Sequence, residues 1–212
     1  AALCSIYVVN EDTVRAKDIV ISGYGTVRIY PAQTSFIFNE NNTWQVSKPN
    51  RYKVTGSLTF NVNNVSGQAA TLTDGLATGT GAFSTLQAAV NRLCSDLDIS
   101  PATVSDIVTI QLTSGQTLTE QVNLCAYLET GISNTQNNPT ILGGGTPGNF
   151  IVDGTNGSAI QIVAVPTPWI MNSFTVTAAT GNGLNADAPQ TFLYFANMRF
   201  GVAANHMQAA NG

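Results

Sequence analysis

Charged side chains are scarce in this sequence. Aspartate, glutamate, lysine and arginine make up 9% of its 212 residues, against about 25% in an average globular protein. Eight residues are basic, and two of them, Arg92 and Arg199, come after Lys53. Phosphate backbones and anionic membrane surfaces are bound by clustered lysine and arginine. The sequence therefore argues against nucleic acid as a partner and against docking on an anionic membrane.

Cysteine and long apolar runs are also rare. The three cysteines, Cys4, Cys94 and Cys125, lie far apart and show no metal-binding spacing such as C-x-x-C. We expect them to be buried free thiols, which fits assembly in a reducing compartment, and we expect no metal ion and no cofactor. No apolar run approaches the roughly 18 residues of a membrane span, so membrane insertion is not expected.

Threonine, asparagine and glycine are abundant where charged residues are scarce. The sequence contains 26 threonines, 21 asparagines and 19 glycines. These residues favour strands, turns and hydrogen bonds from side chain to backbone over helices. The composition therefore predicts an all-β protein with many tight corners.

Residues 1–56 are predicted to form a small antiparallel β domain. Two hairpins are expected, pairing residues 18–22 with 26–30 and residues 34–38 with 43–47, because Gly- or Asn-rich turns join the members of each pair. A fifth strand is predicted over residues 52–62, with a break at Gly56. Residues 57–83 are rich in Gly, Thr, Ala and Asn without periodicity, and we expect them to be a linker.

One amphipathic helix is predicted over residues 84–97. Its apolar residues follow helical spacing: Leu86, Ala89, Val90, Leu93 and Leu97. Ser84 and Gln87 form the pattern S-x-x-Q of a capping box. The helix has one apolar face, so it is expected to lie on the rest of the domain rather than inside it.

A repeat of about 24 residues runs through the C-terminal half. Aligned columns are Trp169 and Leu193; Met171 and Phe195; Phe150, Phe174 and Met198; Val152, Val176 and Phe200; and Ile160, Leu184 and Met207. A fixed period of strands and corners predicts a parallel β-solenoid, in which stacked coils bury these columns. A β-sandwich with coincidental spacing is the alternative. A column of Gln161, Asn185 and Gln208 would be either an outward polar ladder or an inward amide stack.

Three segments carry a family resemblance: GTGAFSTLQAAVNRL (79–93), VTIQLTSGQTLTEQVNL (108–124) and TILGGG (140–145). Together they resemble the start of right-handed parallel β-helix proteins of the pectate-lyase-like superfamily, and more narrowly the tail spikes, tail fibres and head fibres of tailed bacteriophages. The resemblance covers roughly residues 57–212. It implies a right-handed parallel β-helix over 84–212, whose open end the helix 84–97 caps. It also implies that residues 1–56 attach to other virion proteins, and that the protein is a homotrimer in the virion, assembled in the host cytoplasm.

Few ionisable side chains follow residue 108. They are Glu120, Glu129, Asp153, Asp187, Arg199 and His206. A glycosidase needs a pair of carboxylates, and lyases of the resembled fold need an acidic Ca²⁺ site and a basic residue. We predict no catalytic, cofactor or metal site here, because Asp153 and Asp187 are typical turn residues. Glu120 is predicted to be a solvated rim charge, and Asp153, Asp187 and Arg199 are the candidates for a glycan contact.

Three functions follow from this sequence. The leading hypothesis is a structural and adhesive virion protein that projects a β-helix towards a host surface glycan. One alternative is a polysaccharide depolymerase, a lyase or glycosidase whose acidic site lies further along the chain. The other is a secreted bacterial β-helix adhesin at the cell surface. We also expect the chain to continue past Gly212, because the last coil would otherwise expose its apolar interior.

Overall fold

The computed structural model divides the chain into two compact units, Ala1–Tyr52 and Lys53–Gly212. The structure describes residues 5–9, 11, 17–21, 25–29, 34–40, 43–46, 52–54, 56–99, 108–127, 138–163, 167–187 and 193–210. The division falls a few residues before the segment 57–83 that was predicted as a linker. The first residues of that segment form a strand of the second unit.

Antiparallel pairing organises the first unit. A three-stranded sheet has the order β1 (Ser5–Val9), β4 (Thr34–Glu40) and β5 (Thr43–Val46), and β2 (Lys17–Ile21) pairs with β3 (Gly25–Ile29). Both predicted hairpins are confirmed, because β2 pairs with β3 and β4 with β5. The strand β1 was not predicted from the sequence.

The predicted break in the strand over residues 52–62 is confirmed. The chain forms two strands there, β6 (Tyr52–Lys53) and β7 (Leu58–Val62). β6 pairs with β8 (Leu97–Asp98), while β7 pairs in parallel with β9 (Val108–Leu112). Gly56, between them, is where the sequence predicted a break.

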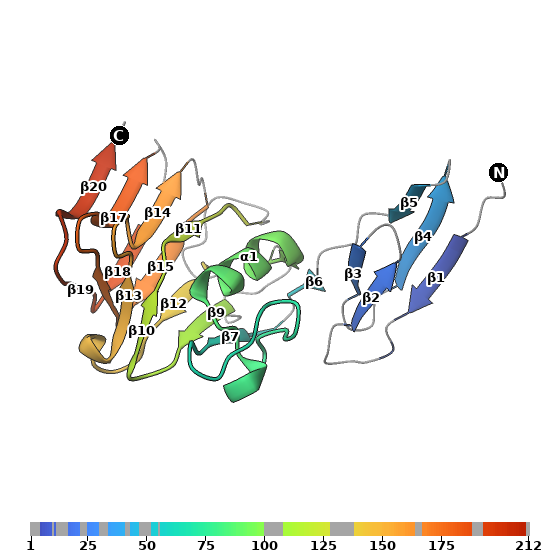
Figure 1. Ribbon diagram of the computed structural model, residues 1–212, viewed down its shortest axis with the longest axis horizontal. Helices are drawn as coiled ribbons and strands as arrows, with labels where there is room; N and C mark the ends of the chain where they lie inside the picture. The colour runs from blue at the N-terminus through green and yellow to red at the C-terminus, as the bar shows by residue number, and fades with distance from the viewer. Residues whose placement is uncertain are drawn as a thin grey trace. The chain divides into compact units, whose positions relative to one another are not determined.

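Three parallel sheets make up most of the second unit, and successive strands join them in turn (Figure 1). The five-stranded sheet has the order β18 (Leu193–Ala196), β15 (Trp169–Asn172), β12 (Thr140–Leu142), β9 and β7. A four-stranded sheet contains β10 (Gln116–Thr119), β13 (Phe150–Asp153), β16 (Thr175–Thr177) and β19 (Arg199–Phe200). The other contains β11 (Val122–Leu124), β14 (Ile160–Val163), β17 (Asn182–Asp187) and β20 (Asn205–Ala210). From β9 onward, every third strand returns to the same sheet.

The strands pair in the register that the 24-residue repeat predicts. Paired columns are Trp169 with Leu193; Val152, Val176 and Phe200; and Ile160, Leu184 and Met207. These columns of the repeat alignment are therefore confirmed. Because all these pairs are parallel, they are inconsistent with the antiparallel sheets of a β-sandwich.

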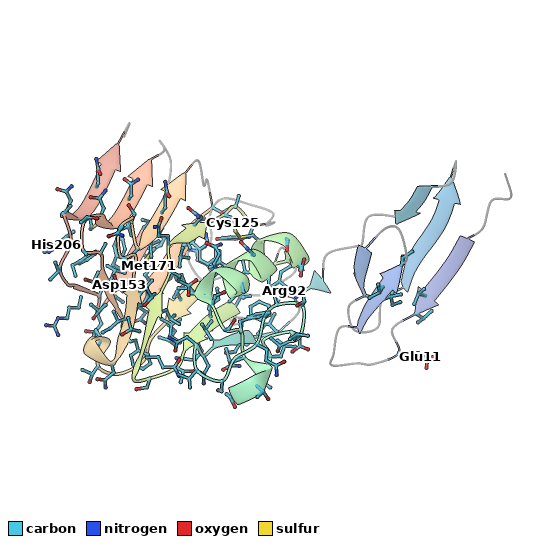
Figure 2. The ribbon with its side chains drawn as sticks, in the orientation of Figure 1. Glu11, Arg92, Cys125, Asp153, Met171 and His206 are labelled. Carbon is cyan, nitrogen blue, oxygen red and sulfur yellow. A yellow bond between two sulfur atoms is a disulfide. The ribbon has the colours of Figure 1, made fainter. Side chains whose placement is uncertain are left out.

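The core of the second unit consists of these apolar columns. Ile110, Ile141 and Met171 pair across β9, β12 and β15, and each side chain is fully buried. Figure 2 shows Met171 inside this unit, among the parallel strands. One column of branched and flexible apolar side chains thus fills the interior along the five-stranded sheet.

The glycine run GGGTPG (143–148) forms the corner between β12 and β13. It leads into the 3₁₀ turn η2 (Pro147–Asn149), and Gly144 and Gly145 have positive φ angles of 128° and 69°. A Cβ atom added to Gly143 would lie 1.9 Å from the carbonyl oxygen of Ser173. Glycine is required there because two neighbouring turns of the chain approach this closely.

Candidate functional site

The three candidate residues from the sequence are not brought together. Asp153 on β13 and Arg199 on β19 share a sheet but have β16 between them, and Asp187 ends β17 in another sheet. The Asp153 carboxylate accepts a hydrogen bond from the Thr155 N–H at 2.9 Å, which is the turn role predicted for it. Arg199 is exposed. These residues therefore form no common site.

The other ionisable residues fall into three cases. His206 is exposed, and its ring stacks on Phe200 with 5.9 Å between ring centroids. Glu129 lies outside the described residues. Glu120 is not the solvated rim charge that was predicted, because it binds the helix described next. Within the described part of the chain, no group of three or more His, Cys, Asp or Glu side chains could hold a metal ion.

The predicted helix is α1 (Leu86–Asp96). One hydroxyl and one carboxylate side chain accept hydrogen bonds from the N–H groups at its N-terminus. The Thr85 hydroxyl accepts from the Ala88 N–H at 3.2 Å. The Glu120 carboxylate accepts from the Leu86 N–H at 2.7 Å and from the Gln87 N–H at 2.9 Å. The first three N–H groups of the helix thus all have acceptors, one from the N-cap and two from a residue over 30 positions away.

Burial and hydrogen bonding act in opposite directions on Glu120. Burial raises the pKa of its carboxyl above the usual 4.5, and the bonds from the Gln87 and Leu86 N–H groups lower it, with the net shift upward. Desolvation of the carboxylate therefore outweighs its stabilisation by the helix N-terminus.

The predicted capping box is wrong. Thr85, not Ser84, is the N-cap, and the Gln87 side chain bonds Asn91 in the same helix and Asn123 on β11 instead of the N-cap. The Gln87 amide donates to the Asn123 carbonyl at 3.1 Å and accepts from the Asn123 N–H at 2.6 Å. The predicted buried face is confirmed: Leu86, Ala89, Val90 and Leu93 are each 0% exposed.

Cys94 and Cys125 form a disulfide, so the prediction of free thiols is wrong for both. Their Cα atoms are 6.1 Å apart, and the bond joins α1 to the chain just after β11. Cys4 lies outside the described residues. The two cysteines are 31 residues apart in the sequence. No local motif links positions that far apart, so the disulfide could not be predicted from their spacing.

One end of the three parallel sheets is sealed. The edge of β7 that does not face β9 is hydrogen-bonded to the segment 75–83. The Asn61 N–H donates to the Gly75 carbonyl at 2.7 Å, and the Phe83 N–H donates to the Asn61 carbonyl at 2.8 Å. On β10, the Asn64 amide donates to the Thr117 carbonyl at 2.6 Å. On β11, the Gln87 amide provides both bonds. Side chains and a loop thus satisfy edges that another strand would otherwise pair.

The opposite end is open in the described part of the chain. β18, β19 and β20 each have a partner strand on one side only. The apolar columns become exposed there: Phe195 is 39% exposed where its neighbour Met171 is 0%, and Met207 is 50% exposed where Leu184 is 1%. Each sheet therefore begins with a covered strand and ends with an uncovered one.

A row of amide side chains follows the outer face of the sheet β11-β14-β17-β20. We call it the amide ladder; its members are Asn123, Gln161, Asn185 and Gln208, which pair in register. The neighbouring positions Ile160, Ile162 and Leu184 are buried, whereas the ladder side chains are half-buried or exposed. The ladder therefore faces outward, which decides between the two alternatives that the sequence left open.

Comparison with known proteins gave no match, since no family model, no curated protein and no solved structure corresponds to the chain. Among the described residues, no helix has the length and hydropathy needed to cross a membrane.

Proposed function

We propose that this chain is a structural and adhesive virion appendage protein of the phage tail or head fibre or spike type. In this proposal the second unit is a right-handed parallel β-helix, and α1 is its cap. The observation that carries the proposal is the sealed end followed by strands in constant register. An architecture of this kind grows by adding equivalent coils, so it makes a rigid projection of any required length.

The two units take different roles in this proposal. Residues 1–56 anchor the protein to other virion proteins, and the β-helix projects towards a host surface glycan. Low charge supports a homotrimer about the shaft, because surfaces rich in threonine and asparagine pack together without desolvating many ions. The protein is then located in the virion.

The test is to find the protein on virus particles. An antibody raised against the second unit should decorate purified virions from the source of the sequence, at the tail or the head, in negative-stain micrographs. Virions without label, whose protein content also lacks the chain by mass spectrometry, would overturn the proposal.

A second candidate, a secreted bacterial β-helix adhesin, is favoured by the Cys94–Cys125 disulfide. Structural disulfides persist mainly in secreted and surface proteins and are rare in the cytosol. The same antibody separates the two candidates, because an adhesin would be labelled on the outer surface of uninfected cells. The depolymerase alternative has no such support among the described residues, because its acidic site is expected further along the chain.

A further inference from the structure

The amide ladder presents hydrogen-bonding groups at regular intervals. Adjacent strands in a sheet are about 4.8 Å apart, so the four amides span about 14 Å across the sheet. The strands are held by apolar side chains on the inner face: Ile160 and Ile162 are 0% exposed and Leu184 is 1% exposed. The row is therefore rigid, and its direction crosses the strands.

Most of the hydrogen-bonding capacity of the ladder is unused within the protein. Among the described residues, no side-chain hydrogen bond is made by Asn123, Gln161 or Asn185, and Asn123 uses only its backbone to bind Gln87. Gln208 differs, because its carbonyl oxygen accepts from Asn182. Three consecutive amides can thus bind an external group.

The chemistry of an amide selects the class of ligand. Each amide offers two N–H donors and a carbonyl acceptor, and a hydroxyl group is likewise both donor and acceptor. Phosphate, sulfate and carboxylate groups only accept, and ammonium groups only donate. The ladder positions carry no charge, so an ionic group would lose its hydration there without gaining a counter-charge. The best match is a neutral chain rich in hydroxyl groups.

We propose that the amide ladder is a binding site for a neutral glycan, which lies across the strands with successive sugar residues contacting Asn123, Gln161 and Asn185. The inference rests on the proposed adhesive function and names the surface and the ligand class through which it operates. Asp187 is the last residue of β17 and follows the ladder residue Asn185 on the same strand. The proposed binding does not require it.

The experiment measures glycan binding by the full chain. The probes are immobilised neutral hexasaccharides of glucose, galactose, mannose or N-acetylglucosamine, with sulfated forms of the same backbones beside them. Biolayer interferometry gives the Kd of wild type and of the double variant Gln161→Ala/Asn185→Ala. Loss of two hydrogen-bonding groups should weaken binding to the neutral probe by about tenfold or more.

Two further double variants control for folding and for chemistry. Asn156→Ala/Thr117→Ala removes two exposed polar side chains outside the ladder, and it should bind like wild type. Gln161→Asn/Asn185→Gln keeps both amides, and it should retain most of the binding. Circular dichroism and light scattering establish that each variant keeps the fold and the mass of wild type; if the alanine variant does not fold, Gln161→Ser/Asn185→Ser replaces it.

Each outcome has a separate meaning. Equal binding by the ladder variant and its control overturns this inference and leaves the proposed function standing. Binding of sulfated probes alone overturns it as well, because the ladder offers no cation. A change of mass in the ladder variant means that the ladder joins copies of the chain, which also overturns it. No binding of any probe by wild type contradicts both the inference and the adhesive part of the proposed function.

Discussion

Two side chains in this protein make hydrogen bonds that backbone groups normally make. The Glu120 carboxylate satisfies two N–H groups of α1, and the Gln87 amide supplies the donor and acceptor that a neighbouring strand would give to Asn123. Both contacts join residues more than 30 positions apart, so each stabilises tertiary structure rather than a local element. The stability of the helix therefore depends on residues outside it.

Replacing Glu120 with glutamine should change how stability depends on pH. The folded pKa of Glu120 lies above its ordinary value of 4.5, so the folded protein binds more protons and wild-type stability falls as pH rises from 4.5 through that higher pKa. Glu120→Gln should lack this fall and be about as stable as wild type at low pH, because the protonated carboxyl, like the glutamine amide, offers one carbonyl acceptor and a donor. Urea unfolding, followed by the fluorescence of buried Trp169, measures both. Parallel pH curves for the two proteins would contradict this role.

The disulfide predicts a change in thiol count and in stability. Reduction in denaturant should release two more titratable thiols per chain than denaturant alone, because Cys94 and Cys125 are bonded. Cys94→Ser/Cys125→Ser should lower the unfolding free energy by about 3 kcal/mol, as expected for a loop of this length. An equal thiol count with and without reductant would rule out the bond.

At the scale of elements, α1 and the corners determine how the sheets begin and turn. The buried face of α1 lies against the first strands, and the disulfide joins its last turn to the segment after β11. The corner at Gly143 brings two turns of the chain within contact. Both features predict strong effects from small substitutions.

A charge on the buried face of α1 should destabilise the second unit. Leu93 is fully buried, so Leu93→Asp would bury an unpaired carboxylate and cost about 4 kcal/mol. Asn91→Asp on the exposed face of the same helix is the matched control and should cost less than about 1 kcal/mol. Chemical denaturation of both variants gives the comparison. A free energy of unfolding unchanged by Leu93→Asp would refute the placement of the helix.

A methyl group at Gly143 should also be costly. Its Cβ would overlap the Ser173 carbonyl, whereas a Cβ at Gly56 would meet nothing within 4 Å. We expect Gly143→Ala to lose about 2 kcal/mol or more, and Gly56→Ala to be neutral or slightly stabilising. Thermal unfolding of the two variants tests this, and equal melting temperatures would show that the corner is looser than described.

At the scale of the whole molecule, copies of the chain are proposed to associate. A homotrimer should have three times the chain mass of 22.2 kDa by light scattering at micromolar concentration. Its mass should hold in high salt, because few ions contribute to the contact. A monomeric mass for the intact, soluble chain would remove this proposal.

The sequence predicted the repeated part of this molecule well and its long-range contacts poorly. The columns through Val152, Ile160 and Trp169 were predictable because stacked coils repeat the same side chain at the same place. Glu120 and Cys125 were misjudged, since nothing local in the sequence links them to α1. Asn123 was missed in the amide ladder because 38 residues, rather than 24, separate it from Gln161 in the sequence.

The sealed end limits how copies of this chain can associate through their strands. A fibre that grows head to tail needs an unpaired strand at both ends of every subunit. Here the loop 75–83, Asn64 and Gln87 occupy the edges at one end, so within the described residues the three parallel sheets offer unpaired strand edges at one end only. Two copies that pair through β18, β19 and β20 would therefore present only covered strand edges of these three parallel sheets to a third copy.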